Sequence, residues 1–345
     1  MYKYEVTIGI PIYNVEQYVR RTLDSALSQT HKSIEFLICD DASTDSSTAI
    51  VEEYQREHPR GKDIRLIRQP VNLGVGNTRN CILEETQGKY LFFLDADDEL
   101  LPRTIERMYL EAEKTNAELI YGSHFRVEEW RKDGKTFLYK YPNHLFLSTE
   151  EFTHFVYSKY DAIQVPVWNV LMRVEFLNEI NMHFPPINFW EDFAVTMFLP
   201  TQTHRVGLLS DVTYIYHCRY GSLSHFQKRS YIPKQEIQSV IDALSKLKFK
   251  SLKYKQQENF SQMYKKMMMT FFYMACSILR QNDIISPAYT NREIRDIMKS
   301  PLSIGEVFCL RKARWTNLIL CILGSLPSVM SVFLMKWLAY RRRLI

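Results

Sequence analysis

Short apolar runs alternate with amphipathic segments over the first hundred residues. Four runs are rich in β-branched or aromatic residues and predict strands at residues 6–12, 34–39, 64–67 and 90–94. Between them, residues 15–29, 48–54 and 76–86 carry apolar side chains at helical spacing. Strands that are apolar on both faces and separated by helices are typical of a parallel sheet covered on both sides. The pattern therefore predicts an α/β fold with a mostly parallel sheet flanked by helices.

The pattern changes after the first hundred residues. The pattern predicts further strands at residues 118–122 and 205–217 and helices at residues 150–157 and 193–199. From residue 233 to about residue 299 the spacing is helical, with Met and aromatic side chains on one stripe. Such a stripe is typical of a packed core, so we expect a helical extension after the sheet.

An uncharged stretch lies near the end of the chain. Residues 315–335 carry no charge over 21 residues, and a membrane span needs about 20. Gly324 and Pro327 interrupt the stretch, so we expect two short helices that lie at a membrane interface rather than one span. Trp, Tyr, Lys and Arg flank it, as they do at membrane–water boundaries. A buried pair of terminal helices is the alternative, but it leaves the basic excess unexplained.

The formal net charge of +5 comes from this tail. From Arg311 onward there are seven Lys/Arg and no Asp/Glu, and the rest of the chain has 37 basic and 39 acidic residues. A near-neutral body argues against a nucleic-acid partner, whereas a basic apolar tail suits an anionic membrane surface. The first residues show no secretory pattern, and the six cysteines form no C-x-x-C pair. We expect a cytoplasmic protein, peripheral or monotopic on the inner face of the cell membrane. The oligomeric state stays open, a homodimer included.

Acidic residues directly follow the fourth predicted strand. Asp95, Asp97 and Asp98 put three carboxylates within four residues, and their mutual repulsion favours a bound cation. The carboxyl ends of parallel strands face one crevice, so the loops after the other strands would meet this cluster there. Hard oxygen ligands suit Mn²⁺ or Mg²⁺ bound together with a diphosphate. A solvated acidic turn is the alternative for such a cluster taken alone.

The loops after the second and third strands offer groups for a nucleotide. Asp40 could accept a hydrogen bond from the N3–H of a uracil. Arg79 could pair with phosphate oxygens or, equally, with Asp95 or Asp97. Gly74 allows a tight backbone turn.

A second acidic pair, Glu191 and Asp192, lies among aromatic residues. Desolvation there would raise a carboxyl pKa toward that of a useful general base. An acidic residue that interacts with the dipole at a helix N-terminus is the alternative.

Three segments together resemble the family 2 glycosyltransferases, which have the Rossmann-like GT-A fold. They are VTIGIPIYNVEQYVRRTLDSALSQTHKSIEFLICDDASTDSS, NLGVGNTRNCILEETQGKYLFFLDADDELLP and FWEDF. The resemblance is close over residues 6–102 and weaker to about residue 224. Two departures are Asp41-Ala42-Ser43, where D-G-S is more familiar, and Asn169, where Lys is usual.

The resemblance implies a role for each matching residue. The donor-binding residues would be Pro11, Tyr13, Asp40, Asp41, Asn72, Gly74, Arg79, Asp95, Ala96 and Arg219. Asp97 and His217 would bind the metal, and Asp192 would act as catalytic base beside Glu191. Asp98, Trp168 and Trp190 would contact the acceptor.

The resemblance also implies an activity, the metal-dependent, inverting, non-processive transfer of one sugar from a nucleotide diphosphate donor. We expect a UDP-sugar as donor and a hydroxyl of a glycan or lipid-linked glycan of surface polysaccharide biosynthesis as acceptor. Processive relatives carry Q-x-x-R-W, and the segment from Arg311 to Trp315 lacks its Gln. One alternative is a sugar nucleotidyltransferase, which would want a Gly-rich loop after the first strand. The other is a non-catalytic, membrane-bound nucleotide-sugar-binding scaffold, which would keep the acidic cluster and lose the base.

These observations predict that the chain is divided into four parts. Residues 1–110 would be the nucleotide-sugar-binding half of a GT-A domain and residues 111–228 its acceptor-binding half. Residues 229–303 would be a helical extension, and residues 304–345 a basic, apolar, membrane-associating tail.

Overall fold

The computed structural model describes residues 2–129, 134–158, 163–219, 230–342 and 344. The chain forms two compact units, and each is described by itself. The first, called the α/β unit, comprises Met1–Phe152 and Gln164–Gln227; the second, called the helical unit, comprises Thr153–Ile163 and Lys228–Ile345. Apart from residues 153–163 and 228, the expected halves at residues 1–110 and 111–228 fall in the α/β unit, and the expected extension and tail fall in the helical unit.

Four parallel strands form one half of the sheet in the α/β unit. They are β1 (Tyr4–Ile12), β2 (Ile34–Asp40), β3 (Ile64–Arg68) and β4 (Gly88–Phe93). Their order is β3-β2-β1-β4, so Gly9 of β1 pairs with Leu37 on one side and Phe93 on the other. Every residue of β2 is buried. The four strands predicted from the sequence are confirmed, each within two residues at its ends.

The other half of the sheet is mixed. β9 (Val170–Arg173) runs antiparallel between β4 and β6 (Leu119–Glu128). β10 (Val206–Cys218) lies parallel to β6 and pairs with the short β5 (Glu99–Leu100). β7 (Thr136–Tyr139) and β8 (His144–Phe146) pair with β6 and β10 at the side. β5, β7, β8 and β9 were not predicted.

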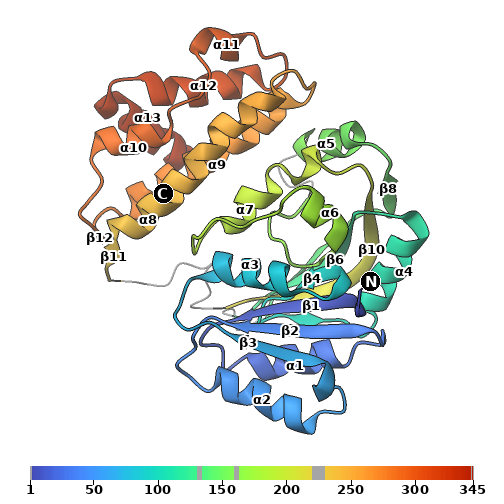
Figure 1. Cartoon of the computed structure of the whole chain (residues 1–345). Coiled ribbons are helices and arrows are strands. Elements are labelled where there is room, and N and C mark those ends of the chain that lie inside the picture. The colour runs from blue at the N-terminus through green and yellow to red at the C-terminus, as the bar shows by residue number, and fades with distance from the viewer. Residues whose placement is uncertain (1, 130–133, 159–162, 220–229, 343, 345) are drawn as a thin grey trace. The chain divides into compact units, whose positions relative to one another are not determined.

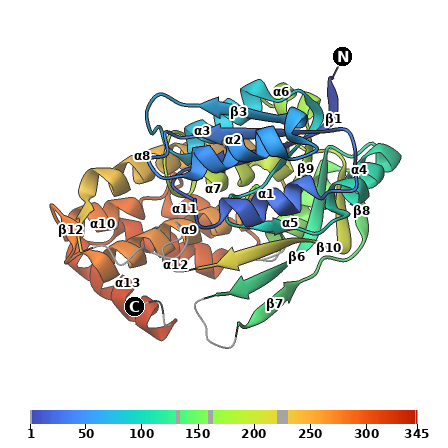
Figure 2. The same ribbon diagram turned by 90° about the horizontal axis from the view of Figure 1, so that it is seen from below.

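Helices cover both faces of the parallel half. α1 (Val19–Leu27) and α2 (Ser47–Glu57) lie on one face and α3 (Val75–Glu85) on the other (Figure 1). Figure 2, seen from below, shows α1 and α2 in front of the strands. The remaining α-helices of the α/β unit are α4 (Thr104–Thr115), α6 (Val174–Glu179) and α7 (Glu191–Thr196), and α5 (Thr149–Ser158) runs from this unit into the helical unit. Because helices pack against both faces, the carboxyl ends of these strands are where a ligand is expected to bind.

The helical unit is built on one long buried helix, α9 (Phe260–Gln281). The other α-helices wholly within the unit are α8 (Lys234–Ser251), α10 (Asn291–Ile297), α11 (Ile304–Phe308), α12 (Arg314–Ser325) and α13 (Ser328–Arg341); β11 (Ile232–Pro233) and β12 (Ile285–Ser286) form a small ladder. α12 and α13 both pack on α9 and α10. The break at Leu326 and Pro327 confirms the prediction of two short helices. Within the described ranges, no helix has the length and apolar character that crossing a membrane requires.

Candidate active site

Hydrogen bonds to its two aspartates fix the conformation of the loop after β2. Asp40 accepts hydrogen bonds from the backbone N–H of Ser43 (3.0 Å) and from the Thr48 hydroxyl (2.8 Å). Asp41 accepts from the backbone N–H groups of Leu73 (2.7 Å) and Gly74 (2.8 Å). Both side chains are buried. These bonds couple the loop after β2 to the loop after β3.

Gly74 is required where it stands. Its φ is +87°, a conformation that side-chain-bearing residues rarely adopt. A Cβ here would lie 2.0 Å from Oδ1 of Asn188. The glycine therefore lets the loop after β3 approach the segment that leads to α7.

The Arg79 side chain contacts three carboxyl groups, and we call these four side chains the Arg79 cluster: Arg79, Asp95, Glu191 and Asp192. The guanidinium lies 2.7 Å from Oδ1 of Asp192 and 3.0 Å from Oδ1 of Asp95, and it also pairs with Glu191. Only 4% of the Arg79 side chain is exposed. Of the two roles expected for Arg79, the ion pair with Asp95 is present; the contact with phosphate stays a prediction. Arg79 on α3 thus joins the acidic loop after β4 to α7, whose Glu191 lies 112 residues after Arg79.

Neighbouring aromatic and amide groups fix this arrangement. The Arg79 guanidinium lies 6.0 Å and 5.8 Å from the ring centroids of Phe93 and Phe184. Asn80, which the sequence did not single out, exchanges two 2.8 Å hydrogen bonds with the backbone of Phe184. The segment before α7 is therefore anchored on α3. A polar residue beside a predicted contact was the only available signal for Asn80.

The acidic pair on α7 occupies the environment that its sequence suggested. Burial raises the pKa of Asp192 well above its usual value; the Arg79 guanidinium opposes that shift and the Glu191 carboxylate adds to it. Burial likewise raises the pKa of Glu191. Asp192 keeps 17% of its side chain exposed, against 8% for Glu191. Of the two, Asp192 is the more accessible to a hydroxyl group.

The loop after β4 presents Asp97 to a basic side chain. Oδ2 of Asp97 accepts a 2.8 Å hydrogen bond from Nε of Arg219, whose guanidinium lies 4.0 Å from the centroid of the Tyr18 ring. Burial raises the pKa of Asp97, and Arg219 opposes this shift. Both Asp97 and Arg219 remain partly exposed. Asp97 is thus available to a ligand, while Asp95 beside it is held by Arg79.

Asp98 and Trp168 do not reach solvent as acceptor-binding residues would. The Asp98 carboxylate is fully buried and accepts hydrogen bonds from the Tyr214 hydroxyl (2.7 Å) and the His217 backbone N–H (2.8 Å). Trp168 is 5% exposed and stacks on Tyr214 with ring centroids 4.7 Å apart. Both side chains instead contact residues of β10 and so fix this strand next to the acidic loop. The geometry therefore gives no support to the acceptor contacts implied for these two residues.

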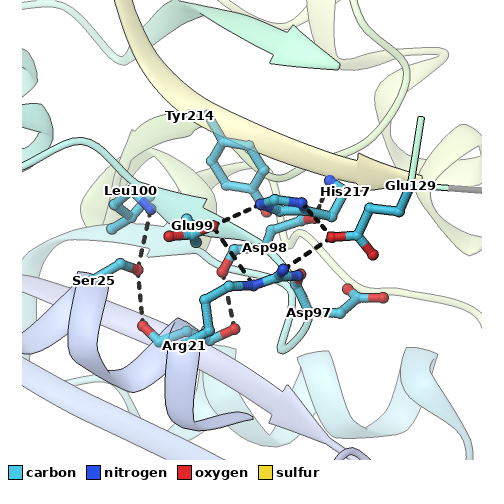
Figure 3. Close-up of polar contacts among 10 residues, drawn as sticks. Arg21, Ser25, Asp97, Asp98, Glu99, Leu100, Glu129, Tyr214 and His217 are labelled. Carbon is cyan, nitrogen blue, oxygen red and sulfur yellow. Dashed lines mark hydrogen bonds and ion pairs between the residues drawn. The ribbon is translucent and has the colours of Figure 1, made fainter. Parts of the chain in front are cut away.

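A second group of polar side chains contacts the acidic loop. We call it the His217 cluster: Arg21, Glu99, Glu129 and His217. Figure 3 shows the His217 ring between the carboxylates of Glu99 and Glu129, each 2.7 Å from one ring nitrogen. Arg21 lies 2.9 Å from Glu129 and donates a 2.7 Å hydrogen bond to the backbone oxygen of Asp97. His217, implied as a metal ligand, thus contacts carboxylates other than Asp97. The sequence did not single out Arg21, Glu99 or Glu129, because α1, β5 and the end of β6 meet only in the fold.

The remaining predicted residues lie around the ends of the parallel strands. Tyr13 follows β1 and is 46% exposed, Trp190 precedes α7 and is 39% exposed, and Asn72 is exposed. Pro11 lies near the end of β1, and Ala96 is buried within the acidic loop. Tyr13 and Trp190 are therefore the aromatic side chains here that can contact a ligand. Their roles stay predictions.

The donor set at the acidic loop fits a divalent ion that is shared with a ligand. Asp97 and Asp95 offer oxygen atoms, the ligands that Mg²⁺ and Mn²⁺ prefer. Among the described residues, no three His, Cys, Asp or Glu side chains are grouped so as to hold an ion by themselves. Mg²⁺ is commonly held by one or two carboxylates and completed by substrate phosphates.

Comparison with known proteins gives a consistent result. A family model described as glycosyl transferase family 2 matches residues 7–175. Glycosyltransferase GlyA of Streptococcus pneumoniae is 25% identical over 247 residues, which are 70% of this chain and 34% of GlyA. The Escherichia coli protein named UDP-Glc:alpha-D-GlcNAc-diphosphoundecaprenol beta-1,3-glucosyltransferase WfaP is 39% identical over 113 residues, which are 32% of this chain and 42% of WfaP. The chain thus matches less than half the length of both relatives.

The fold as a whole has a solved counterpart. The crystal structure of S. aureus TarS 1–349 in complex with UDP-GlcNAc superposes with a TM-score of 0.68 at 16% identity. The match covers 98% of this chain and 92% of that one. At this identity the likeness shows the fold alone.

Proposed function

Because this chain belongs to glycosyl transferase family 2 and has the GT-A fold, we propose that it transfers a sugar from a UDP-linked donor to an acceptor hydroxyl, with inversion. The observation that carries the proposal is the Arg79 cluster. Through Arg79, a carboxylate suited to take a proton lies beside the acidic loop suited to a diphosphate.

The nucleotide would bind at the ends of β1 and β2. Tyr13 is exposed there, and the loops that contain Asp40, Asp41 and Gly74 are fixed to one another by hydrogen bonds. A preorganised loop loses little entropy on binding. The UDP-GlcNAc complex of TarS and the UDP-Glc in the name of WfaP support a UDP-sugar donor.

The diphosphate would bind at Asp97. Asp97, with Asp95 beside it, would hold Mn²⁺ or Mg²⁺, which supplies positive charge to the leaving diphosphate. Arg219, now paired with Asp97 at 2.8 Å, is the cation that can turn to the phosphate oxygens when the ion is bound. Arg79 would act differently from the phosphate contact first expected, because its guanidinium is buried against carboxylates. It would orient Asp192.

The chemical step is a single displacement. Asp192 takes the proton of the acceptor hydroxyl, and the hydroxyl oxygen forms a bond to the anomeric carbon. The bond from that carbon to the β-phosphate oxygen breaks on the opposite face, and the nucleoside diphosphate leaves with its electron pair. No protein nucleophile is needed, so the configuration inverts. The raised pKa of Asp192 makes its carboxylate a stronger base than an exposed aspartate.

The acceptor is proposed to be a glycan or lipid-linked glycan that receives one sugar per encounter, in surface polysaccharide biosynthesis. WfaP supports a lipid-linked acceptor, since its name contains a diphosphoundecaprenol. Trp190, which is exposed at the start of α7, would contact this acceptor.

The test is a panel of UDP-sugars with Mn²⁺, scored both for release of UDP and for a glycosylated product. One sugar should give UDP release that requires the ion and rises when acceptor is added. Donor binding without UDP release would assign the chain to the scaffold alternative. Formation of a sugar nucleotide from a sugar phosphate and UTP would assign it to the nucleotidyltransferases.

A further inference from the structure

One side of α13 carries large apolar side chains that are about half or more exposed. Its exposed members are Val329 (68%), Met330 (54%), Phe333 (69%), Trp337 (48%) and Tyr340 (75%). The opposite side, with Val332 and Met335, is buried against the unit. Large apolar side chains thus lie on both sides of α13, with Lys336 and Arg341 exposed beside them. Apolar surface of this extent is normally covered, so this exposed side calls for a partner.

α12 also has an exposed apolar side. Trp315, Ile319 and Ile322 follow one another at helical spacing and are all exposed. A two-residue turn joins α12 to α13, and the Ser331 hydroxyl donates a 2.6 Å hydrogen bond to the Leu323 backbone oxygen. The two helices therefore form one hairpin (Figure 1), which we call the apolar hairpin (residues 314–341).

The charge carried by the apolar hairpin itself has one sign, because residues 314–341 contain Lys and Arg but no Asp or Glu. No Asp or Glu follows Glu306 in the sequence. Across the described ranges, Arg311, Lys336 and Arg341 make no ion pair, and Arg341 lies 5.0 Å from the centroid of the Trp337 ring. The partner of this surface must therefore tolerate exposed aromatic rings and supply negative charge.

We propose that the exposed faces of α12 and α13 rest on an anionic lipid bilayer, parallel to its surface. Apolar side chains would enter the acyl boundary while Trp, Tyr, Lys and Arg lie at the headgroups, where these residue types are enriched. A second copy of the chain is a poorer partner, because a twofold contact would place the same cations against one another. The inference rests on the helical unit alone and does not depend on the proposed sugar transfer.

The proposal is tested by flotation of the whole chain with vesicles. Vesicles of phosphatidylcholine with phosphatidylglycerol should carry the protein upward, and vesicles of phosphatidylcholine alone should carry far less. Phe333→Ser should weaken binding about tenfold, because a large apolar side chain no longer enters the bilayer. Lys336→Glu should weaken it about fivefold for each unit of charge lost near the surface.

Matched controls lie on α8. Phe249 is 68% exposed, close to the 69% of Phe333, but it lies outside the apolar hairpin, so Phe249→Ser should leave vesicle binding unchanged. Lys246→Glu is the corresponding control for Lys336→Glu, because Lys246 is exposed on the same helix. Circular dichroism melting shows that each variant is folded. Failure of the wild-type chain to float, or equal losses in the control variants, would overturn the proposal. So would a dimer that Phe333→Ser dissociates without any binding to vesicles.

Discussion

The two charged clusters of the α/β unit differ in their balance of charge. The His217 cluster sets Arg21 and the His217 ring, which is charged only when protonated, against two carboxylates. The Arg79 cluster sets one guanidinium against three carboxyl groups, and Arg79, Glu191 and Asp192 are more deeply buried than Arg21, Glu99 and Glu129. A cluster with as many basic as acidic side chains can be stable without a bound ligand and suits a structural role. An excess of buried negative charge is unfavourable by itself and is typical of a site that binds or moves positive charge.

The largest expected effect is on the base of the Arg79 cluster. Asp192→Asn should lower kcat by about 10²- to 10⁴-fold, the usual contribution of a general base. The fold and donor binding should survive, because the amide keeps the size of the carboxylate. Steady-state UDP release checks this, with Asp283→Asn, an exposed aspartate of the helical unit, as control. An Asp192→Asn enzyme that turns over like wild type would remove the residue from the mechanism.

The next effect is on stability. Arg79→Met should lower the free energy of unfolding by about 3–5 kcal/mol, because buried carboxylates would lose their only counter-charge in the cluster. Urea unfolding measures this. Arg103→Met, which breaks the exposed pair with Glu106, should change little. Equal stability of the two variants would show that the Arg79 cluster does not hold α7 in place.

A smaller effect separates the two roles of His217. If the His217 cluster braces the acidic loop, Glu129→Gln and His217→Asn should raise the half-saturating Mn²⁺ concentration by similar factors, about tenfold. Glu129 contacts Arg21 and His217 and not Asp97. A much larger loss for His217→Asn than for Glu129→Gln would instead restore His217 as a metal ligand.

The smallest effect is a shift in pH dependence. Asp192 must be ionised to take a proton, so activity falls as the pH drops through its raised pKa. Glu191→Gln removes a negative charge that raises this pKa, so the acid limb of kcat/KM should move to lower pH. Activity measured across the acid range decides the sign. A limb that stays in place or moves to higher pH would contradict the electrostatic coupling of the two carboxyl groups.

What the sequence predicted and what it missed follow from the range of the contacts. The four parallel strands and the break in the tail are local patterns, and both were predicted. β9 is a four-residue run whose place between β4 and β6 depends on pairings with distant strands. The core position of Trp168 depends on Tyr214, which the chain brings to it only when β10 pairs with β6. Such features need the fold, as the Arg21 contact with the acidic loop also does.

The central claim is that the acidic loop after β4 and the carboxylate of Asp192 act on one bound donor. A crystal structure with the donor UDP-sugar and Mn²⁺ tests this most directly. The account predicts the ion between Asp97 and the diphosphate, with the anomeric carbon facing the side of the site where Asp192 lies. A nucleotide bound away from Asp97, or a sugar turned away from Asp192, would contradict it.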